Sequence, residues 1–453
     1  EIPGPAVGIA VDVQQEAQQA IGLGFAGGCG GREIPGGNRP TFPSFGRLAR
    51  FRRSRSPAAP STTGARRVLL EAPQASAVAM KHLLLLAAGL FAAALASGAA
   101  EHEVGRLRLI GEQRLPGRQS FRGTMVGGLS GLDYDPVHDR WIAESDDKSE
   151  HGAARFYRLR LVYDGKAFAS VEVTDVVFFR QPDGSLYPDK PHAQADGGEV
   201  PDIESIRFDP ADGSVWYSSE GDRPLGMNPF VRHATSEGRF LFTLPQPPIF
   251  RIDAARELGP RHNLSFEGLT FSPDGRTLWV AMEAPVYQDG PVPTPQAGAM
   301  TRITHYERAG KVLGQYAYPL DAIPNAPRPG GFADNGISEL LAVDASHFLV
   351  LERSGSEQAP NVYLDSVRLY EMNLAGATDV SALPSLQGAA FRPLKKRLVQ
   401  DLNALGLPVV DNLEGLAWGP RLANGHDTLV LVSDDNFAPN QVMQFLAFEV
   451  LPP

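Results

Sequence analysis

The sequence has 453 residues, one cysteine (Cys29) and a formal net charge of −10 at pH 7. Its first hundred residues hold ten Lys/Arg and five Asp/Glu, so residues 101–453 carry 32 basic and 47 acidic groups, net −15. Such an acidic chain lacks the basic face that nucleic acid requires, and a lone cysteine excludes an intramolecular disulfide. The charge instead suits a protein that concentrates cations or cationic ligands.

The N-terminal part of the chain reads as a leader region. Residues 1–79 are rich in Gly, Pro, Ala and Arg and show no apolar periodicity, whereas Met80 is followed by Lys, His and the apolar run Leu83–Ala96, which ends in small residues. This order is typical of a secretory signal peptide, and the run is too short for a good membrane span. We interpret residues 80–100 as a signal peptide and residues 1–79 as translation upstream of the true start, or alternatively as a disordered extension.

These features predict a periplasmic or secreted protein with no stable membrane span after leader cleavage. Residues 101–453 show no internal domain boundary, and we expect them to form one domain. Their first element is a strand, because Val104–Leu115 alternates apolar and polar residues. It has no partner nearby in the sequence.

A hairpin pattern then recurs five times. In its clearest copy, an apolar run enters a turn of Pro273, Asp274 and Gly275, and a second apolar run leaves it. Proline presets φ for such a turn, aspartate bonds the backbone ahead of it, and glycine takes positive φ without steric cost. The first run of each copy begins at a polar pivot residue, and the pivots are Ser130, Glu204, Glu267, Glu339 and Glu414. Their separations of 74, 63, 72 and 75 residues suit a four-stranded unit with long loops, as in a propeller.

Two more strands fit within the intervals between copies, as at Arg155–Tyr163 and Val171–Arg180, and at Met300–Arg308 and Lys311–Pro319. The sequence therefore predicts an all-β fold, a β-propeller with five visible four-stranded blades. Six blades stay possible, because the long connections leave room for short strands.

The end of the chain is expected to close the ring. A short helix is expected over Leu394–Leu405, before the last copy. The final apolar stretch, Val442–Val450, is then the natural partner of the unpaired strand Val104–Leu115. This pairing would complete the last blade and remove the exposed sheet edges.

The ordered motifs resemble a known family. Leu-Ser-Gly-Leu-Asp-Tyr-Asp, Asp-Ile-Glu-Ser-Ile, Phe-Glu-Gly-Leu-Thr-Phe-Ser-Pro-Asp-Gly, Gly-Ile-Ser-Glu-Leu and Asn-Leu-Glu-Gly-Leu-Ala-Trp occur in this order. Together they resemble the bacterial phytase-like domain family, also described as having esterase-like activity of phytase, over nearly all of residues 101–453. The resemblance implies an exported β-propeller distantly similar to the calcium-dependent propeller phytases.

Carboxylates are the candidate site residues. If the first strand of each hairpin is innermost, the pivots share one mouth of the channel with the ends of the second strands, and Glu267 lies beside Glu283. Crowded carboxylates repel one another unless a cation holds them, and Ca²⁺ tolerates irregular shells of roughly six to eight oxygens. We assign the catalytic role to Glu204, Glu267, Glu339 and Glu414. The candidate metal ligands are these four with Glu144, Asp146, Glu220, Asp222, Glu283, Glu352, Asp434 and Asp435. Alternatively, each pivot glutamate caps backbone N–H groups of a neighbouring blade and binds nothing.

Basic residues follow the second-strand acids in three copies. Lys148, Arg223 and Arg353 are candidates for holding the oxygens of a phosphate or carboxylate, although ordinary ion pairing with those acids explains them equally well. Ser130 is rejected as a nucleophile, because its motif lacks the second glycine of a Gly-x-Ser-x-Gly elbow and precedes a strand. The first blade is therefore expected to contribute through Glu144 or Asp146.

These observations predict a calcium-dependent phosphoester hydrolase that acts at the acidic mouth, with a calcium-activated water as nucleophile. Two alternatives stay open. One is a metal-dependent lactonase or carboxylester hydrolase, and the other is a propeller that binds a ligand without turnover. The expected partner is a small anionic or ester substrate, with no nucleic acid, and the protein is expected to be a monomer.

Overall fold

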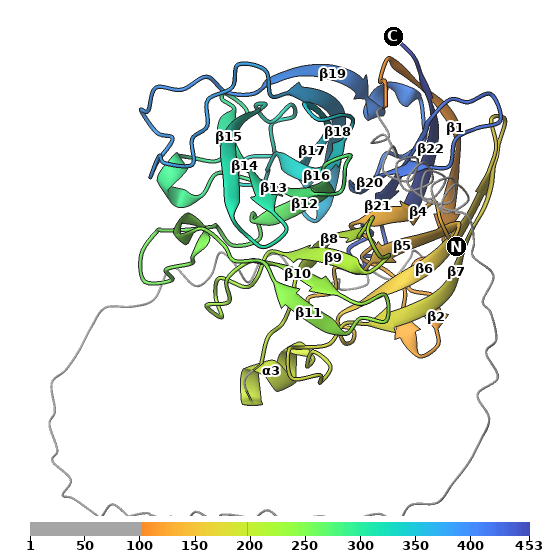
Figure 1. The fold of residues 1–453 in the computed structure, drawn as a ribbon, viewed down its shortest axis with the longest axis horizontal. Coiled ribbons are helices and arrows are strands. Elements are labelled where there is room, and N and C mark those ends of the chain that lie inside the picture. Colours follow the sequence, from red (N-terminus) through yellow and green to blue (C-terminus); the bar gives the residue numbers. More distant parts are fainter. Residues whose placement is uncertain (1–101, 197) are drawn as a thin grey trace, which may run out of the picture. The chain divides into compact units, whose positions relative to one another are not determined.

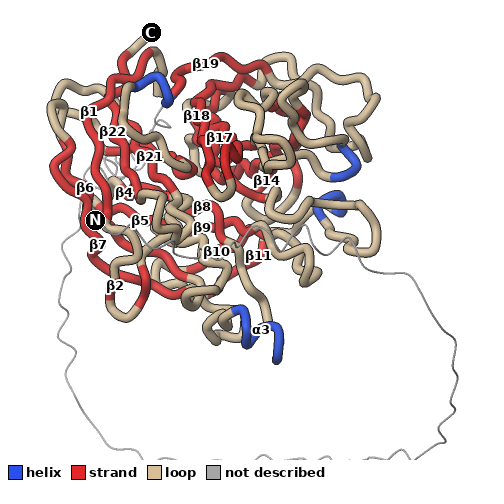
Figure 2. Tube along the Cα trace, turned by 180° about the vertical axis from the view of Figure 1, so that it is seen from behind, coloured by secondary structure: helices blue, strands red, loops and turns tan. Residues whose placement is uncertain are grey.

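The computed structural model describes residues 102–196 and 198–453. The predicted leader and the segment before it lie outside the described residues. Five four-stranded antiparallel sheets form a five-bladed β-propeller (Figures 1 and 2), which confirms the predicted all-β architecture and replaces the six-bladed alternative. A two-stranded sheet, β2 (Ser120–Phe121) with β3 (Thr124–Met125), is the remaining sheet among the described residues.

In the first four blades the strands follow one another outward from the innermost strand. Blade 1 consists of β4 (Leu132–Asp135), β5 (Arg140–Glu144), β6 (Arg155–Tyr163) and β7 (Phe168–Phe178). Blade 2 consists of β8 (Ile203–Phe208), β9 (Val215–Ser219), β10 (Phe230–Ala234) and β11 (Phe240–Thr243). Blade 3 consists of β12 (Phe266–Phe271), β13 (Thr277–Met282), β14 (Ala299–Glu307) and β15 (Val312–Leu320). Blade 4 consists of β16 (Gly336–Ala342), β17 (His347–Ala359), β18 (Val362–Asn373) and β19 (Lys395–Asp401).

The innermost strands are the first strands of the repeated hairpins. Every residue of β8, β12 and β16 is buried, because both faces of an innermost strand are covered by neighbouring blades. Each innermost strand contacts the next in chain order, and β20 (Leu413–Gly419) contacts β4. The five strands therefore form a closed ring around one axis.

Blade 5 is completed by the two ends of the described chain. Its order is β20, β21 (Thr428–Ser433), β22 (Met443–Leu451) and β1 (Arg106–Leu115), and β1 pairs with β22 from Arg106 opposite Leu451 to Leu115 opposite Met443. The predicted closure is confirmed. Apolar side chains join this blade to blade 1, where Val432 packs in one cluster with Leu132 and Ala143.

The segment expected to form a helix near the end of the chain is mostly a strand. Residues 395–401 form β19, the outer strand of blade 4, and a short 3₁₀-helix, η3 (Leu402–Leu405), follows it. Arg397 pairs across the sheet with Glu371. Lys395, Lys396 and Arg397 give this edge strand the charged side chains that discourage association with other strands.

Helices contribute little to this fold. The remaining ones among the described residues are the α-helix α3 (Lys190–Asp196) and the 3₁₀-helices η1 (Pro248–Phe250) and η2 (Tyr287–Asp289). Over residues 102–196 and 198–453, no helix combines the length and apolar character needed to cross a bilayer.

Candidate functional site

One backbone hydrogen bond recurs at the same end of four blades and defines equivalent residues. It runs from the N–H of Asp146, Glu220, Glu283 and Asp434 to the carbonyl of Gly128 (2.7 Å), Asp202 (2.9 Å), Ser265 (2.7 Å) and Asn412 (3.0 Å), respectively. In blade 4, Arg353 pairs with Gly336 at the same place. The outer ring of the mouth, as we define it, therefore consists of Asp146, Glu220, Glu283, Arg353 and Asp434.

β-Bulges position the side chains just inside this ring. The register shifts between Ile203 and Ser205, and the corresponding shift recurs in β12, β16 and β20. A bulge bends its strand and redirects the side chain that it carries. The equivalent residues, which we call the inner ring, are Ser130, Glu204, Glu267, Ser338 and Glu414. With Asp202, the two rings form what we call the acidic mouth.

The fourth repeat is shifted by one residue from the sequence-based alignment, because Ser338 rather than Glu339 occupies the inner ring. Glu339 lies one position deeper and is fully buried. Its carboxylate accepts hydrogen bonds from the N–H groups of Leu269 (3.0 Å) and Leu340 (2.8 Å) and from Ser205 Oγ (2.9 Å). Burial raises the pKa of Glu339 to about 7, and the charge of Arg207, 2.8 Å away, opposes that rise.

Arg207 closes the channel below the mouth. Its guanidinium donates to the carbonyl of Leu269 (2.7 Å) and to one carbonyl in each of the other four innermost strands, those of Leu132, Ile206 (3.4 Å), Leu340 (3.2 Å) and Leu416 (3.0 Å). A group that reaches all five strands must lie on the axis of the ring. We call Arg207, Glu339 and the five carbonyls the axial plug.

Two triplets of carboxylates in the acidic mouth have the spacing of cation sites. One is Asp146, Asp202 and Glu204, the other is Glu204, Glu220 and Glu267, and within each triplet one oxygen per residue lies within 4.8 Å of the others. The two triplets share Glu204. Asp146 Oδ1 and Asp202 Oδ1 are buried and have no hydrogen-bond partner among the described residues. Such oxygens are costly unless a ligand satisfies them.

Burial and mutual repulsion dominate the electrostatics here. Burial, followed by the charges of Glu267 and Asp202, holds the pKa of Glu204 well above its usual range. Burial, and then Asp202, raises the pKa of Glu220 to about 8. Burial, and next the charge of Glu283, raises the pKa of Glu267 well above its usual range. Burial and mutual repulsion therefore both favour the protonated forms of these carboxyl groups.

Two basic side chains reach the acidic mouth among the described residues. Arg353 contacts Asp334 (3.1 Å), Glu414 (3.2 Å) and Glu283 (3.4 Å), and its Nε is buried without a partner. Lys148 lies 3.1 Å from Asp202. Both were predicted from the sequence to bind substrate, and the structure brings both to the mouth.

Blade 1 adds Glu144, which lies one step deeper than the outer ring. Its Oε1 accepts from the N–H of Gly131 (2.6 Å), whereas its buried Oε2 has no partner among the described residues. Asp435 is similar, since one oxygen accepts from the N–H of Gly128 (2.9 Å) and Oδ2 is unpartnered. Ser130 donates its hydroxyl to Glu414 (2.5 Å), so it orients a carboxylate of the mouth.

Three sequence-predicted residues have other surroundings. Glu352 accepts from Tyr318 Oη (2.7 Å) of blade 3 and from Asn335 Nδ2 (3.1 Å), and it pairs with Lys396 of blade 4. Arg223 donates to four backbone carbonyls, those of Asp253 (2.8 Å), Arg256 (2.8 Å), Leu258 (3.0 Å) and Pro260 (2.7 Å). Asp222 accepts from the N–H of Leu225 (2.9 Å) and forms a turn. The structure does not bring these three into the carboxylate triplets.

Asp202 was not predicted to be a site residue. It is 5% exposed, belongs to a triplet and pairs with Lys148. Asp202 comes directly before β8, whose bulge redirects Glu204, so strand alternation alone does not place the two side chains together.

Comparisons with known proteins agree with this architecture. A family model described as phytase-like, with esterase-like activity of phytase, matches residues 124–437. An "Uncharacterized secreted protein" of Arthroderma benhamiae is 26% identical over 203 residues, and the match covers 38% of this chain and 38% of that protein, so the chain spans well under half of its relative's length.

Two solved structures show distant likeness. The tail fibre of Staphylococcus aureus phage P68 has 9% identity and a TM-score of 0.31, covering 75% of this chain and 53% of the fibre chain. The N-terminal domain of Nup159 has 11% identity and a TM-score of 0.32, covering 77% of this chain and 97% of that domain. At these scores neither bears on function. The family match spans more than half of the chain, and the protein therefore belongs to the phytase-like family.

Proposed function

We propose that this phytase-like propeller binds Ca²⁺ in the acidic mouth and hydrolyses a phosphoester there. The observation that carries the proposal is the pair of carboxylate triplets that share Glu204, in which Asp146 Oδ1 and Asp202 Oδ1 are buried and unpartnered. All the donors are carboxylate oxygens, which suit a hard cation better than zinc or copper.

Each side chain has a role in this proposal. Asp146, Asp202, Glu204, Glu220 and Glu267 would hold calcium, which supplies Lewis-acid activation of water and screens the charge of the substrate. Arg353, whose Nε points to no partner, would hold a phosphate oxygen. Ser130 keeps Glu414 oriented toward Arg353, since Glu414 contacts both.

The small number of basic groups restricts the substrate. Lys148 and Arg353 are the basic side chains at the mouth among the described residues, and both already contact carboxylates. This favours a substrate with one phosphate over a polyphosphate. It also favours a second candidate function, hydrolysis of a carboxylic ester or lactone at the same site, which needs fewer cationic groups and accords with the family's description.

We also propose that the protein acts outside the cytoplasm. The signal-like sequence after Met80 supports this, as does the name of the secreted relative.

The test compares the metal-free protein with and without Ca²⁺. We expect calcium to raise the melting temperature and to be required for turnover of an aryl phosphate, with phytate, an aryl ester and a lactone assayed in parallel. Glu204→Gln should abolish both effects, whereas Asp274→Asn, in an exposed turn, serves as the control. A melting temperature that does not change when calcium is added would contradict metal binding. A calcium-dependent shift without turnover of any substrate would leave a ligand-binding propeller.

A further inference from the structure

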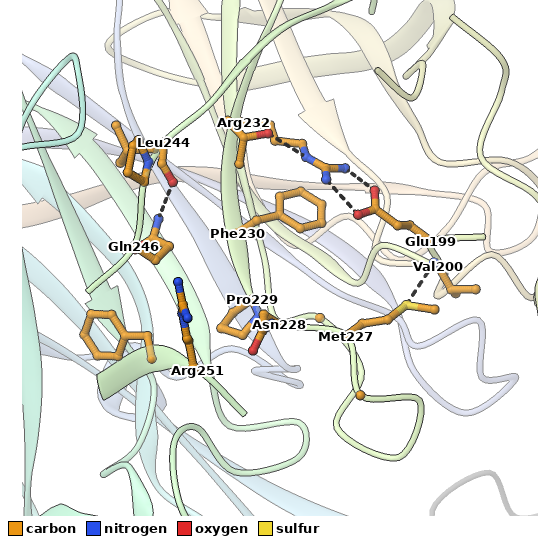
Figure 3. Close-up of a pocket in the computed structure, with 15 residues that line it drawn as sticks. Glu199, Val200, Met227, Asn228, Pro229, Phe230, Arg232, Leu244, Gln246 and Arg251 are labelled. Carbon is orange, nitrogen blue, oxygen red and sulfur yellow. Dashed lines mark hydrogen bonds and ion pairs between the residues drawn. The ribbon is translucent and has the colours of Figure 1, made fainter. Parts of the chain in front are cut away.

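A cavity of about 500 Å³ lies beside blade 2, outside the carboxylate triplets. Its walls come from the loop between β9 and β10, from β10 itself, and from the segment that runs from β11 through η1 (Figure 3). Met227, Pro229, Phe230, Pro245 and Phe250 give it apolar walls. This volume lies within the range of roughly 300–1,000 Å³ that small-molecule sites occupy.

The two arginines of the cavity differ in their partners. Arg232 is buried and bonded to both oxygens of Glu199 (2.6 and 2.9 Å) and to Tyr187 Oη (2.7 Å). Arg251 is exposed, and its side chain forms no ion pair or hydrogen bond with any described residue. In Figure 3 the Arg232–Glu199 pair lies toward one end of the cavity, Arg251 toward the other, and Phe230 between them. Among the charged side chains that line the cavity, Arg251 is therefore the one without a partner of opposite charge in the described residues.

A second cavity, of about 460 Å³, adjoins the first. It is also lined by Arg251, and its other charged side chains, Asp253 and Arg256, form an ion pair (2.5 Å). The two cavities therefore share one uncompensated positive charge, that of Arg251, in a chain whose residues 101–453 have a net charge of −15. A local reversal of sign against the rest of the molecule selects anions.

We propose that the cavity beside blade 2 binds a small organic anion with a flat apolar body, whose negative group pairs with Arg251. The apolar body lies against Phe230, Phe250 and the two prolines. Gln246 also lines the cavity, but its Oε1 accepts from Tyr306 Oη (2.7 Å) and its Nε2 donates to the carbonyl of Leu244 (3.3 Å), so the pairing falls to Arg251. This site is separate from the proposed calcium triplets and does not depend on hydrolysis.

The experiment measures binding of three isosteric probes by calorimetry in the presence of a chelator, which keeps calcium out of the mouth. The probes are 2-naphthoate, neutral 2-naphthylmethanol and cationic 2-naphthylmethylammonium. We expect naphthoate to bind at least tenfold more tightly than the other two. Arg251→Glu should weaken naphthoate binding at least tenfold, whereas Arg256→Glu, the matched control, should change it less than threefold.

A mouth variant separates this proposal from the proposed function. Glu204→Gln should leave naphthoate binding unchanged, and its loss would place the anion in the mouth and overturn the proposal. Absence of naphthoate binding, equal binding of the neutral probe, or equal effects of Arg251→Glu and Arg256→Glu would overturn it as well. The melting temperature of each variant confirms that the protein is folded.

Discussion

The axial plug and the acidic mouth are built on the same five innermost strands, only a few residues apart, yet their charges are balanced in opposite ways. In the plug, one guanidinium meets a carbonyl from every blade and one carboxylate, Glu339. In the mouth, the carboxylates of both rings and Asp202 have only Lys148 and Arg353 as basic neighbours among the described residues.

The difference shows where a ligand is needed. The plug satisfies its own polar groups, so a residue there is structural however conspicuous its charge. The mouth leaves buried oxygens of Asp146 and Asp202 without partners and raises the pKa of Glu204 and Glu220. Removing a charge should therefore destabilise the plug and relieve the metal-free mouth.

The largest effect is expected from Arg207→Met. This change removes the cationic partner of the buried Glu339 and the donor shared by five carbonyls, so it should cost about 3–5 kcal/mol of unfolding free energy in urea titrations. Arg276→Met is the control, because its side chain is 83% exposed and lies 3.8 Å from Asp274. A loss no larger than that of the control would show that the plug does not hold the blades together.

The next effect is a pH dependence in the plug. The pKa of Glu339 is raised to about 7 in the folded protein, so its contribution to stability is full below the unfolded value and is lost as pH rises through about 7. The unfolding free energy of the wild type relative to Glu339→Gln should therefore fall by at most about 3 kcal/mol between pH 4.5 and 8. A difference that stays constant over this range would contradict the prediction.

Removing a charge from the mouth should have the effect opposite to that of Arg207→Met. Glu204→Gln should raise the unfolding free energy of the metal-free protein, because burial and the charges of Glu267 and Asp202 already hold the pKa of Glu204 well above its usual range. Calcium at a hundredfold excess over its Kd should stabilise the wild type by about 2.7 kcal/mol and the variant hardly at all. Asp146→Asn touches one triplet only, so metal analysis should find fewer ions than in the wild type but more than in Glu204→Gln. Equal calcium content in the wild type and both variants would show that the triplets do not bind the metal.

The smallest effect is expected from Ser130→Ala. Loss of its hydrogen bond to Glu414 should cost about 1 kcal/mol in chemical denaturation. Ser120→Ala is the comparison, because Ser120 is exposed and its hydroxyl forms no hydrogen bond with any described residue, and an equal cost would show that the bond from Ser130 to Glu414 does not stabilise the fold.

Much of the fold could be predicted because it depends on local patterns. The turn residues at Pro273, Asp274 and Gly275 and the alternation of the flanking runs specify a hairpin without reference to distant residues. Closure by β1 was predictable since Val104–Leu115 otherwise lacked a partner. The segment 395–401 was misjudged because its charged residues suit a helix surface and a sheet edge equally well.

The candidate site was less accessible to sequence reasoning. In Ile-Ser-Glu-Leu, both Ser338 and Glu339 can be aligned with the other pivots, and only the bulge after Ile337 decides between them. Arg207 looks like a surface residue of an alternating strand until the carbonyls of four other blades surround it. The partners of Arg223 and Glu352 lie on loops and blades that no local pattern connects.

The pairing of β1 with β22 has a consequence for folding during synthesis on the ribosome. Residues 106–115 leave the exit tunnel long before their partner, residues 443–451, has been synthesised. Until then the ring of blades stays open, and β1 has no partner strand. A premature stop codon before β22 would leave β1 without its partner strand, even if every carboxylate of the mouth were still present.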